Sequence, residues 1–123
     1  MIAHEVGHHL QDELGTLNKI GSLMQKNPDR QSELSVALEL QADCYAGIWA
    51  GVMQGKGIIE PTEISQAIDA ASAVGDDRIQ KATTGYINPE TWTHGSSADR
   101  KKWFTTGYTE KSIASCDTFS AKN

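Results

Sequence analysis

The segment HEVGH at residues 4–8 constrains the fold and chemistry of this chain more than any other feature. Two histidines four positions apart lie on one face of an α-helix, with Cβ atoms roughly 5–6 Å apart, so His4 and His8 can bind one zinc ion. Glu5 lies one position further round, where its carboxylate can act on metal-bound water without binding the metal. Val6 marks the opposite, apolar side of the helix, since two residues advance about 200°. The segment therefore predicts a helix with an apolar side and a metal-binding side.

A catalytic zinc site needs a third protein ligand and keeps a fourth position for water. His9 points about 100° away from His8, so it cannot easily join the same ion. Asp12 could bind the ion, but it could equally accept a hydrogen bond from an imidazole N–H. Glu39, which opens the weakly charged segment ELQAD, is the better candidate. Asp43, one helical turn after Glu39, is then placed to accept the free ring N–H of a ligating histidine.

The remaining sequence favours helices and shows no convincing alternation of the kind expected for strands. Apolar spacing and turn-forming residues predict helices over 2–25, 32–53 and 61–82, a polar loop over 83–95, a short helix through residue 104 capped by Ser96 and Asp99, and another turn or two over 112–119. The segment 75–77 can bend the third helix. We expect one all-α domain over 1–123, with the HExxH helix packed on the Glu-x-x-x-Asp helix.

Small residues continue the face of Glu39 and Asp43 along the second helix. Ala46, Gly47 and Ala50 follow at helical spacing. We expect this row to let the first helix approach closely, as a shared metal requires.

Composition indicates that apolar burial is not the whole source of stability. Ile, Leu, Val and Phe make up 23 of the 123 residues, so we expect a metal, a disulfide or a missing partner segment to contribute. The net charge is −5, and the scattered lysines and arginines form no stripe that would bind nucleic acid. No apolar run reaches the 18 or more residues of a spanning helix, so we expect no membrane span within this chain.

Taken together, these segments resemble known metallopeptidases. HEVGH followed by ELQAD resembles the gluzincin arrangement of two histidines and a glutamate, as in the CAAX prenyl protease and HtpX-type enzymes. More closely, the chain is similar to the putative neutral zinc metallopeptidase family of bacteria (YpfJ-like), through AHEVGHHLQ at 3–11, ELQADCYAGIWA at 39–50, THGSSADRKKWF at 93–104 and SCDTF at 115–119. The resemblance implies Zn²⁺ bound by His4, His8 and Glu39, Glu5 as catalytic base, Asp43 supporting a ligand, and a peptide or protein substrate.

The resemblance also implies an extracytoplasmic protein, periplasmic or anchored in the membrane through an N-terminal region of the parent chain. Because the motif begins here at residue 4, we expect a catalytic-core fragment that lacks the upstream sheet on which metallopeptidases usually bind substrate. The implied compartment favours a disulfide between Cys44 and Cys116 over two buried thiols. It would close a 73-residue loop, worth ~4 kcal/mol in the chain-entropy model.

Some interpretations stay open at this point. His94 precedes the capped helix and is either a donor to an oxyanion near the zinc or a loop residue without a catalytic role. The whole chain is either a zinc metalloendopeptidase or a zinc-stabilised structural or binding module without proteolytic activity. A third alternative is a metal-free chain whose ligand-bearing helices lie apart.

Overall fold

The computed structural model describes residues 2–73, 75–87 and 92–119, and helices make up most of these ranges. The α-helices are α1 (Ile2–Glu13), α2 (Thr16–Lys26), α3 (Gln31–Gly55), α4 (Pro61–Ala73), α5 (Asp76–Thr84) and α6 (Ser97–Glu110), and two short 3₁₀ helices are η1 (Pro28–Arg30) and η3 (Ile113–Cys116). No strand occurs in the described ranges. This confirms the predicted all-α class, and no helix there is both long and apolar enough to cross a membrane.

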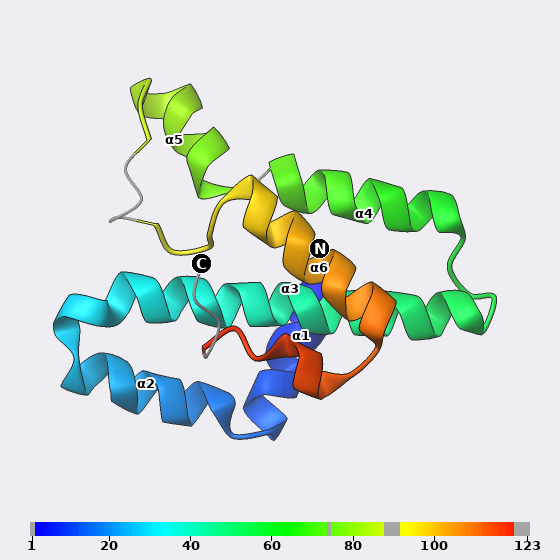
Figure 1. Ribbon diagram of the computed structural model, residues 1–123, viewed down its shortest axis with the longest axis horizontal. Coiled ribbons are helices and arrows are strands. Elements are labelled where there is room, and N and C mark those ends of the chain that lie inside the picture. The colour runs from blue at the N-terminus through cyan, green and yellow to red at the C-terminus, as the bar shows by residue number, and fades with distance from the viewer. Residues whose placement is uncertain (1, 74, 88–91, 120–123) are drawn as a thin grey trace.

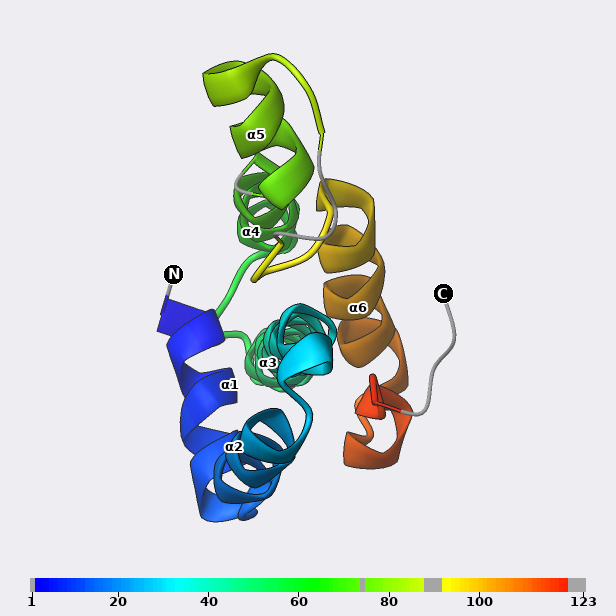
Figure 2. The ribbon, with the colours of Figure 1, turned by 90° about the vertical axis from the view of Figure 1, so that its left-hand side faces the viewer.

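The long helix α3 is the centre of the molecule. Figure 2 looks along α3 and shows α1 and α2 on one side of it and α6 on the other. The central segment of α3, residues 40–47, is entirely buried. In Figure 1, α6 crosses α3 with α4 alongside, and the core between these three helices is formed by Ala46, Ala50, Ile64 and Phe104.

Glycines bring the backbones of α3 and α6 into direct contact. A Cβ atom on Gly47 would overlap the carbonyl oxygen of Phe104, and one on Gly107 would overlap that of Cys44. The small residues of α3 therefore serve the contact with α6 and α4, and the expectation that they seat the first helix was wrong. That helix approaches α3 elsewhere, through Gly7 against the backbone of Ala42.

Two predicted helices are each divided by a glycine. The first ends at Glu13 because Gly15 adopts a left-handed conformation with a φ of 77°, which glycine reaches at little cost. Leu14, which continued the apolar spacing, is 52% exposed. The third ends before Gly75, whose backbone is extended and packs so closely on Ser97 that a Cβ atom would overlap it.

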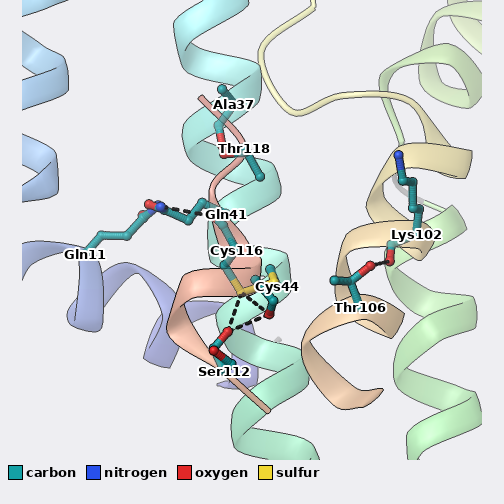
Figure 3. The surroundings of a disulfide bond; sticks show 10 residues. Gln11, Ala37, Gln41, Cys44, Lys102, Thr106, Ser112, Cys116 and Thr118 are labelled. Atoms are coloured by element: carbon teal, nitrogen blue, oxygen red, sulfur yellow. Dashed lines mark hydrogen bonds between the residues drawn. A yellow bond between two sulfur atoms is a disulfide. The ribbon is translucent and has the colours of Figure 1, made fainter. Parts of the chain in front are cut away.

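The C-terminal part is fastened to α3 by a covalent bond. Cys44 in α3 and Cys116 in η3 form a disulfide with Cα atoms 5.6 Å apart (Figure 3). At the other end of α6, the Ser96 hydroxyl accepts a hydrogen bond of 3.0 Å from the Asp99 backbone N–H, which confirms the predicted helix cap. The α6–η3 region is thus capped at its start and covalently bound to α3 at its end.

Candidate metal centre

Helices α1 and α3 bring His4, His8 and Glu39 together. Glu39 Oε2 lies 2.8 Å from His4 Nε2 and 3.0 Å from His8 Nε2. The ligand atoms of the three residues all lie within 4.8 Å of one another. The two imidazole rings meet edge to face, with centroids 4.6 Å apart. The spacing of HEVGH and the position of Glu39 thus lead to one convergent group.

The face of α1 that meets α3 explains this convergence. His4, Gly7, His8 and Gln11 occupy positions i, i+3, i+4 and i+7, so they share one side of the helix. Gly7 is buried, and its missing side chain lets the α1 backbone lie directly on Ala42 of α3. The histidines on either side of this contact are thereby held at the level of Glu39.

The outer nitrogen of His4 is held by a buried carboxylate. His4 Nδ1 lies 2.9 Å from Asp43 Oδ1, and Asp43 is completely buried. Arg100 in α6 donates to both oxygens of Asp43, at 2.8 Å from Nε and 3.1 Å from Nη2. Because this carboxylate accepts from Arg100 and from the Nδ1–H of the ring, Nε2 is the ring atom of His4 that faces Glu39 and donates to it. Asp43 therefore lies where the sequence predicted it.

Arg100 was missed by the sequence reasoning. Its side chain is buried at 5% exposure, on the face of α6 that also carries Trp103, Phe104 and Gly107. One signal in the sequence could have indicated its role: Arg100 is a cation on the same helical face as these apolar residues. A buried arginine needs an anionic partner, which Asp43 supplies.

Mutual hydrogen bonds shift the titration of the three converging groups. Burial opposes the charged form of His4, but hydrogen bonds to Asp43 and Glu39 outweigh it and raise its pKa to about 9. The hydrogen bond to Glu39 raises the pKa of His8. Burial acts against the ionised form of Glu39, but hydrogen bonds from both histidines hold its pKa well below its usual range. In the absence of an ion, protons on the two histidines thus pair with the ionised carboxylate of Glu39.

Their chemistry fits a zinc ion. Two imidazole nitrogens and a carboxylate oxygen are the donor set of one class of catalytic zinc sites. Tetrahedral bonds of about 2.0–2.2 Å place ligand atoms about 3.3 Å apart, so the observed separations of 2.8 and 3.0 Å need to open by only a few tenths of an ångström. The side chains of His4, His8 and Glu39 are 13%, 26% and 18% exposed, so solvent reaches the group. A fourth ligand can therefore come from solvent.

His94 lies at the rim of the same group. Its Nε2 is 3.8 Å from Glu39 Oε1, and its side chain is 49% exposed. Asp76 Oδ2 fixes the loop by accepting backbone N–H groups, at 2.6 Å from His94 and 2.7 Å from Gly95. The ring Nδ1 lies 2.8 Å from the hydroxyl of Thr93.

The other candidates of the first helix lie outside the group. Glu5 follows His4 in α1, and its side chain is exposed. His9 is 73% exposed and lies 3.9 Å from Glu13, on another side of the helix from the convergent group. Asp12 is also exposed. Glu39 is thus the third member of the group, in place of the two alternatives from α1.

Comparison with known proteins places these residues in a wider context. Residues 1–119 match the model of a family described as "Putative neutral zinc metallopeptidase". The uncharacterized protein Rv2575 of Mycobacterium tuberculosis is 50% identical over 131 residues, which cover 98% of this chain and 43% of that protein. The uncharacterized protein YpfJ of Escherichia coli K12 is 44% identical over 120 residues, which cover 97% of this chain and 42% of that protein. The chain thus spans less than half the length of these curated relatives, and no solved structure matches it.

Proposed function

The chain belongs to the putative neutral zinc metallopeptidase family, and from this premise we propose that it binds one zinc ion and hydrolyses peptide bonds. The observation that carries the proposal is the convergence of His4 Nε2 and His8 Nε2 on one oxygen of Glu39, at 2.8 and 3.0 Å. His4, His8 and Glu39 are the proposed ligands. When bound, zinc supplies a Lewis acid that polarises a carbonyl group and lowers the pKa of water toward 7.

Three residues around these ligands have separate proposed roles in catalysis. Glu5, whose exposed carboxylate follows His4 in α1, takes the proton from the attacking water and later gives it to the leaving amine. His94, fixed at the rim by its backbone bond to Asp76, donates a hydrogen bond to the oxyanion that develops on the substrate. Asp43 holds His4 in the orientation that presents Nε2.

We also propose that the protein works outside the cytoplasm. The disulfide between Cys44 and Cys116 supports this location, because such bonds persist in oxidising compartments. The substrate is proposed to be a peptide or protein that reaches the exposed side of the metal centre.

Metal analysis tests the binding part of the proposal. We expect about one zinc per chain in the wild type and a loss in Glu39→Ala, because two imidazoles alone leave the site one protein ligand short. Glu33→Ala is a matched control, since Glu33 lies in α3 but pairs with Arg30 on the surface. Equal zinc content in the wild type and Glu39→Ala would contradict the proposed ligand set.

Peptide hydrolysis tests the catalytic part. The zinc-loaded chain is incubated with a mixture of quenched fluorescent peptides, and Glu5→Gln is expected to lower turnover by at least about 100-fold while zinc content stays the same. Undiminished turnover in Glu5→Gln would refute the base role. A zinc-loaded wild type that cleaves no peptide would favour the zinc-stabilised binding module instead.

A further inference from the structure

We propose that Gln11 and Gln41 are positioning residues for His8, and that through them the metal centre is supported by the disulfide-bonded C-terminal segment. The inference rests on the proposed zinc site and concerns what holds its second imidazole. His4 has a carboxylate behind it, whereas the residue behind His8 is a neutral amide. On the Nδ1 side no charged group orients His8, so its orientation there has to come from hydrogen-bond direction.

Two buried amides form a continuous hydrogen-bonded path from His8 to the C-terminal segment. Gln11 is 0% exposed and Gln41 is 7% exposed. His8 Nδ1 lies 2.9 Å from Gln11 Oε1, and Gln11 Nε2 lies 2.7 Å from the carbonyl oxygen of Leu38 and 2.9 Å from Gln41 Oε1. Gln41 Nε2 in turn lies 3.2 Å from the carbonyl oxygen of Cys116. Figure 3 shows the two glutamine side chains meeting beside the disulfide.

The ends of this path determine the direction of every bond in it. A backbone carbonyl can only accept, so the end of Gln11 that faces Leu38 must be its NH₂ group. For the same reason, the end of Gln41 that faces Cys116 must be its NH₂ group, which leaves its oxygen for Gln11. The end of Gln11 that faces His8 is therefore an oxygen, whichever way either amide was first placed.

This direction fixes which nitrogen of His8 donates to Gln11. An amide oxygen can only accept, so His8 Nδ1 must carry a hydrogen. Nε2 is then the ring atom that faces Glu39, 3.0 Å away, and the atom that is placed to bind an ion. Without Gln11, nothing on the Nδ1 side would accept this hydrogen or hold the ring angle. Gln11 thus prepares His8 as a nitrogen ligand before an ion arrives.

Gln41 and the disulfide keep Gln11 in place. Burying amides is favourable only when their hydrogen bonds are made, and neither glutamine has a buried polar atom without a partner in the described ranges. The acceptor for Gln41 belongs to Cys116, which the bond to Cys44 holds against α3. The C-terminal segment therefore supplies the last acceptor of the path that orients His8.

Zinc affinity in two glutamine variants tests the proposal. The 123-residue chain, with its disulfide intact, is titrated with zinc against a fluorescent chelator. We expect Gln11→Met, which keeps the side-chain length but removes the amide, to weaken zinc binding by about 10–100-fold. Gln41→Met should cause a smaller loss, because Gln11 still donates to Leu38. Gln66→Met, at an exposed position of α4, is the matched control and should bind zinc like the wild type.

A second control separates positioning from general stability. Ile64→Ala removes a core side chain of α4 that lies outside the path, so it should lower the melting temperature and leave zinc affinity within about twofold. The proton signal of His8 Nδ1–H gives a direct readout in zinc-free protein. It should exchange slowly with solvent in the wild type, where Gln11 accepts this hydrogen, and faster in Gln11→Met.

These measurements give the proposal clear ways to fail. Zinc affinity of Gln11→Met within twofold of the wild type would overturn it, as would a His8 Nδ1–H in the zinc-free wild type that exchanges with solvent as fast as the ring N–H of exposed His9. This wild-type measurement decides the matter even if Gln11→Met does not fold. A wild-type chain that binds no zinc would instead refute the proposed function, and the exchange of His8 Nδ1–H would still test the role of Gln11.

Discussion

Substituting Gly7 by alanine should separate the two halves of the metal centre. A Cβ atom on Gly7 would lie 3.0 Å from both the Cα and the carbonyl carbon of Ala42, and nearer still to its oxygen, whereas ordinary contacts are 3.4–4 Å. Because the obstacle is backbone, it cannot rotate away, and α1 must shift by about 0.5–1 Å. Metal–ligand distances tolerate about 0.2 Å. We therefore expect Gly7→Ala to weaken zinc binding by more than about tenfold.

Gly21→Ala is the matched control for this substitution. Gly21 lies inside α2, and a Cβ atom there would meet nothing within 4 Å. Both substitutions gain the same helix propensity, about 1 kcal/mol, so this term cancels between them. The free energy of unfolding should therefore be lower in Gly7→Ala than in Gly21→Ala by the steric cost alone, typically about 1–3 kcal/mol.

Urea unfolding of the zinc-free variants and chelator competition with zinc measure the two effects separately. The control should be as stable as the wild type or more so, with unchanged zinc affinity. If Gly7→Ala matches Gly21→Ala in stability and keeps its zinc affinity within twofold, the close approach of α1 to α3 does not set the geometry of the site.

Three further outcomes are expected. Asp43→Asn removes the anion behind His4 and beside buried Arg100, so zinc affinity should fall about 10–100-fold in a chelator titration, and an unchanged affinity would contradict the role of Asp43. In zinc-free protein, the raised pKa of His4 contributes up to about 3 kcal/mol to the free energy of unfolding below pH 6.5, and this contribution is lost as the pH rises through about 9. The melting temperature should therefore fall more across this pH range in the wild type than in His4→Gln. Parallel melting curves of the two proteins would refute this contribution of His4. Replacing Cys44 and Cys116 by alanine should lower the free energy of unfolding by about 4 kcal/mol in urea, since the two residues are 72 positions apart; a loss below about 1 kcal/mol would show that the disulfide is not a major support.

The sequence was most informative where chemistry depends on spacing along one helix. The four-residue step between His4 and His8 determines that they share a face, and the same step relates Glu39 to Asp43. The structure brings all four side chains together, as the two segments predicted. Local periodicity was sufficient to place each pair on one face, because each pair is presented by a single helix; that the two faces meet was expected from the need for a third zinc ligand.

Residues that act across helices could not be found in this way. Gln11, Gln41 and Arg100 are single polar residues in helical segments, and nothing in their spacing says which partner each meets. Their roles depend on which face of α1, α3 and α6 is buried against another helix, and that is decided by packing.

The breaks between helices show a related limit. Apolar residues continued at helical spacing through Leu14, so periodicity alone predicted one helix where the structure has α1 and α2. The deciding feature is the backbone of Gly15, which turns left-handed and ends the run. A glycine in an otherwise regular apolar pattern is compatible with one continuous helix or with two helices joined by a turn.

The backbone contacts that Gly47 of α3 makes with Phe104, and Gly107 of α6 makes with Cys44, fix the separation of these two helices without any side chain between them. Asp43 lies one turn before Gly47, and Glu39 one turn before Asp43, so both carboxylates belong to the part of α3 that leads into the contact with α6. The imidazoles belong to α1, which joins α2 through the left-handed turn at Gly15. Another backbone contact, that of Gly7 on Ala42, sets the height of α1, so the distance between the imidazoles and the carboxylates depends on how α1 lies on α3.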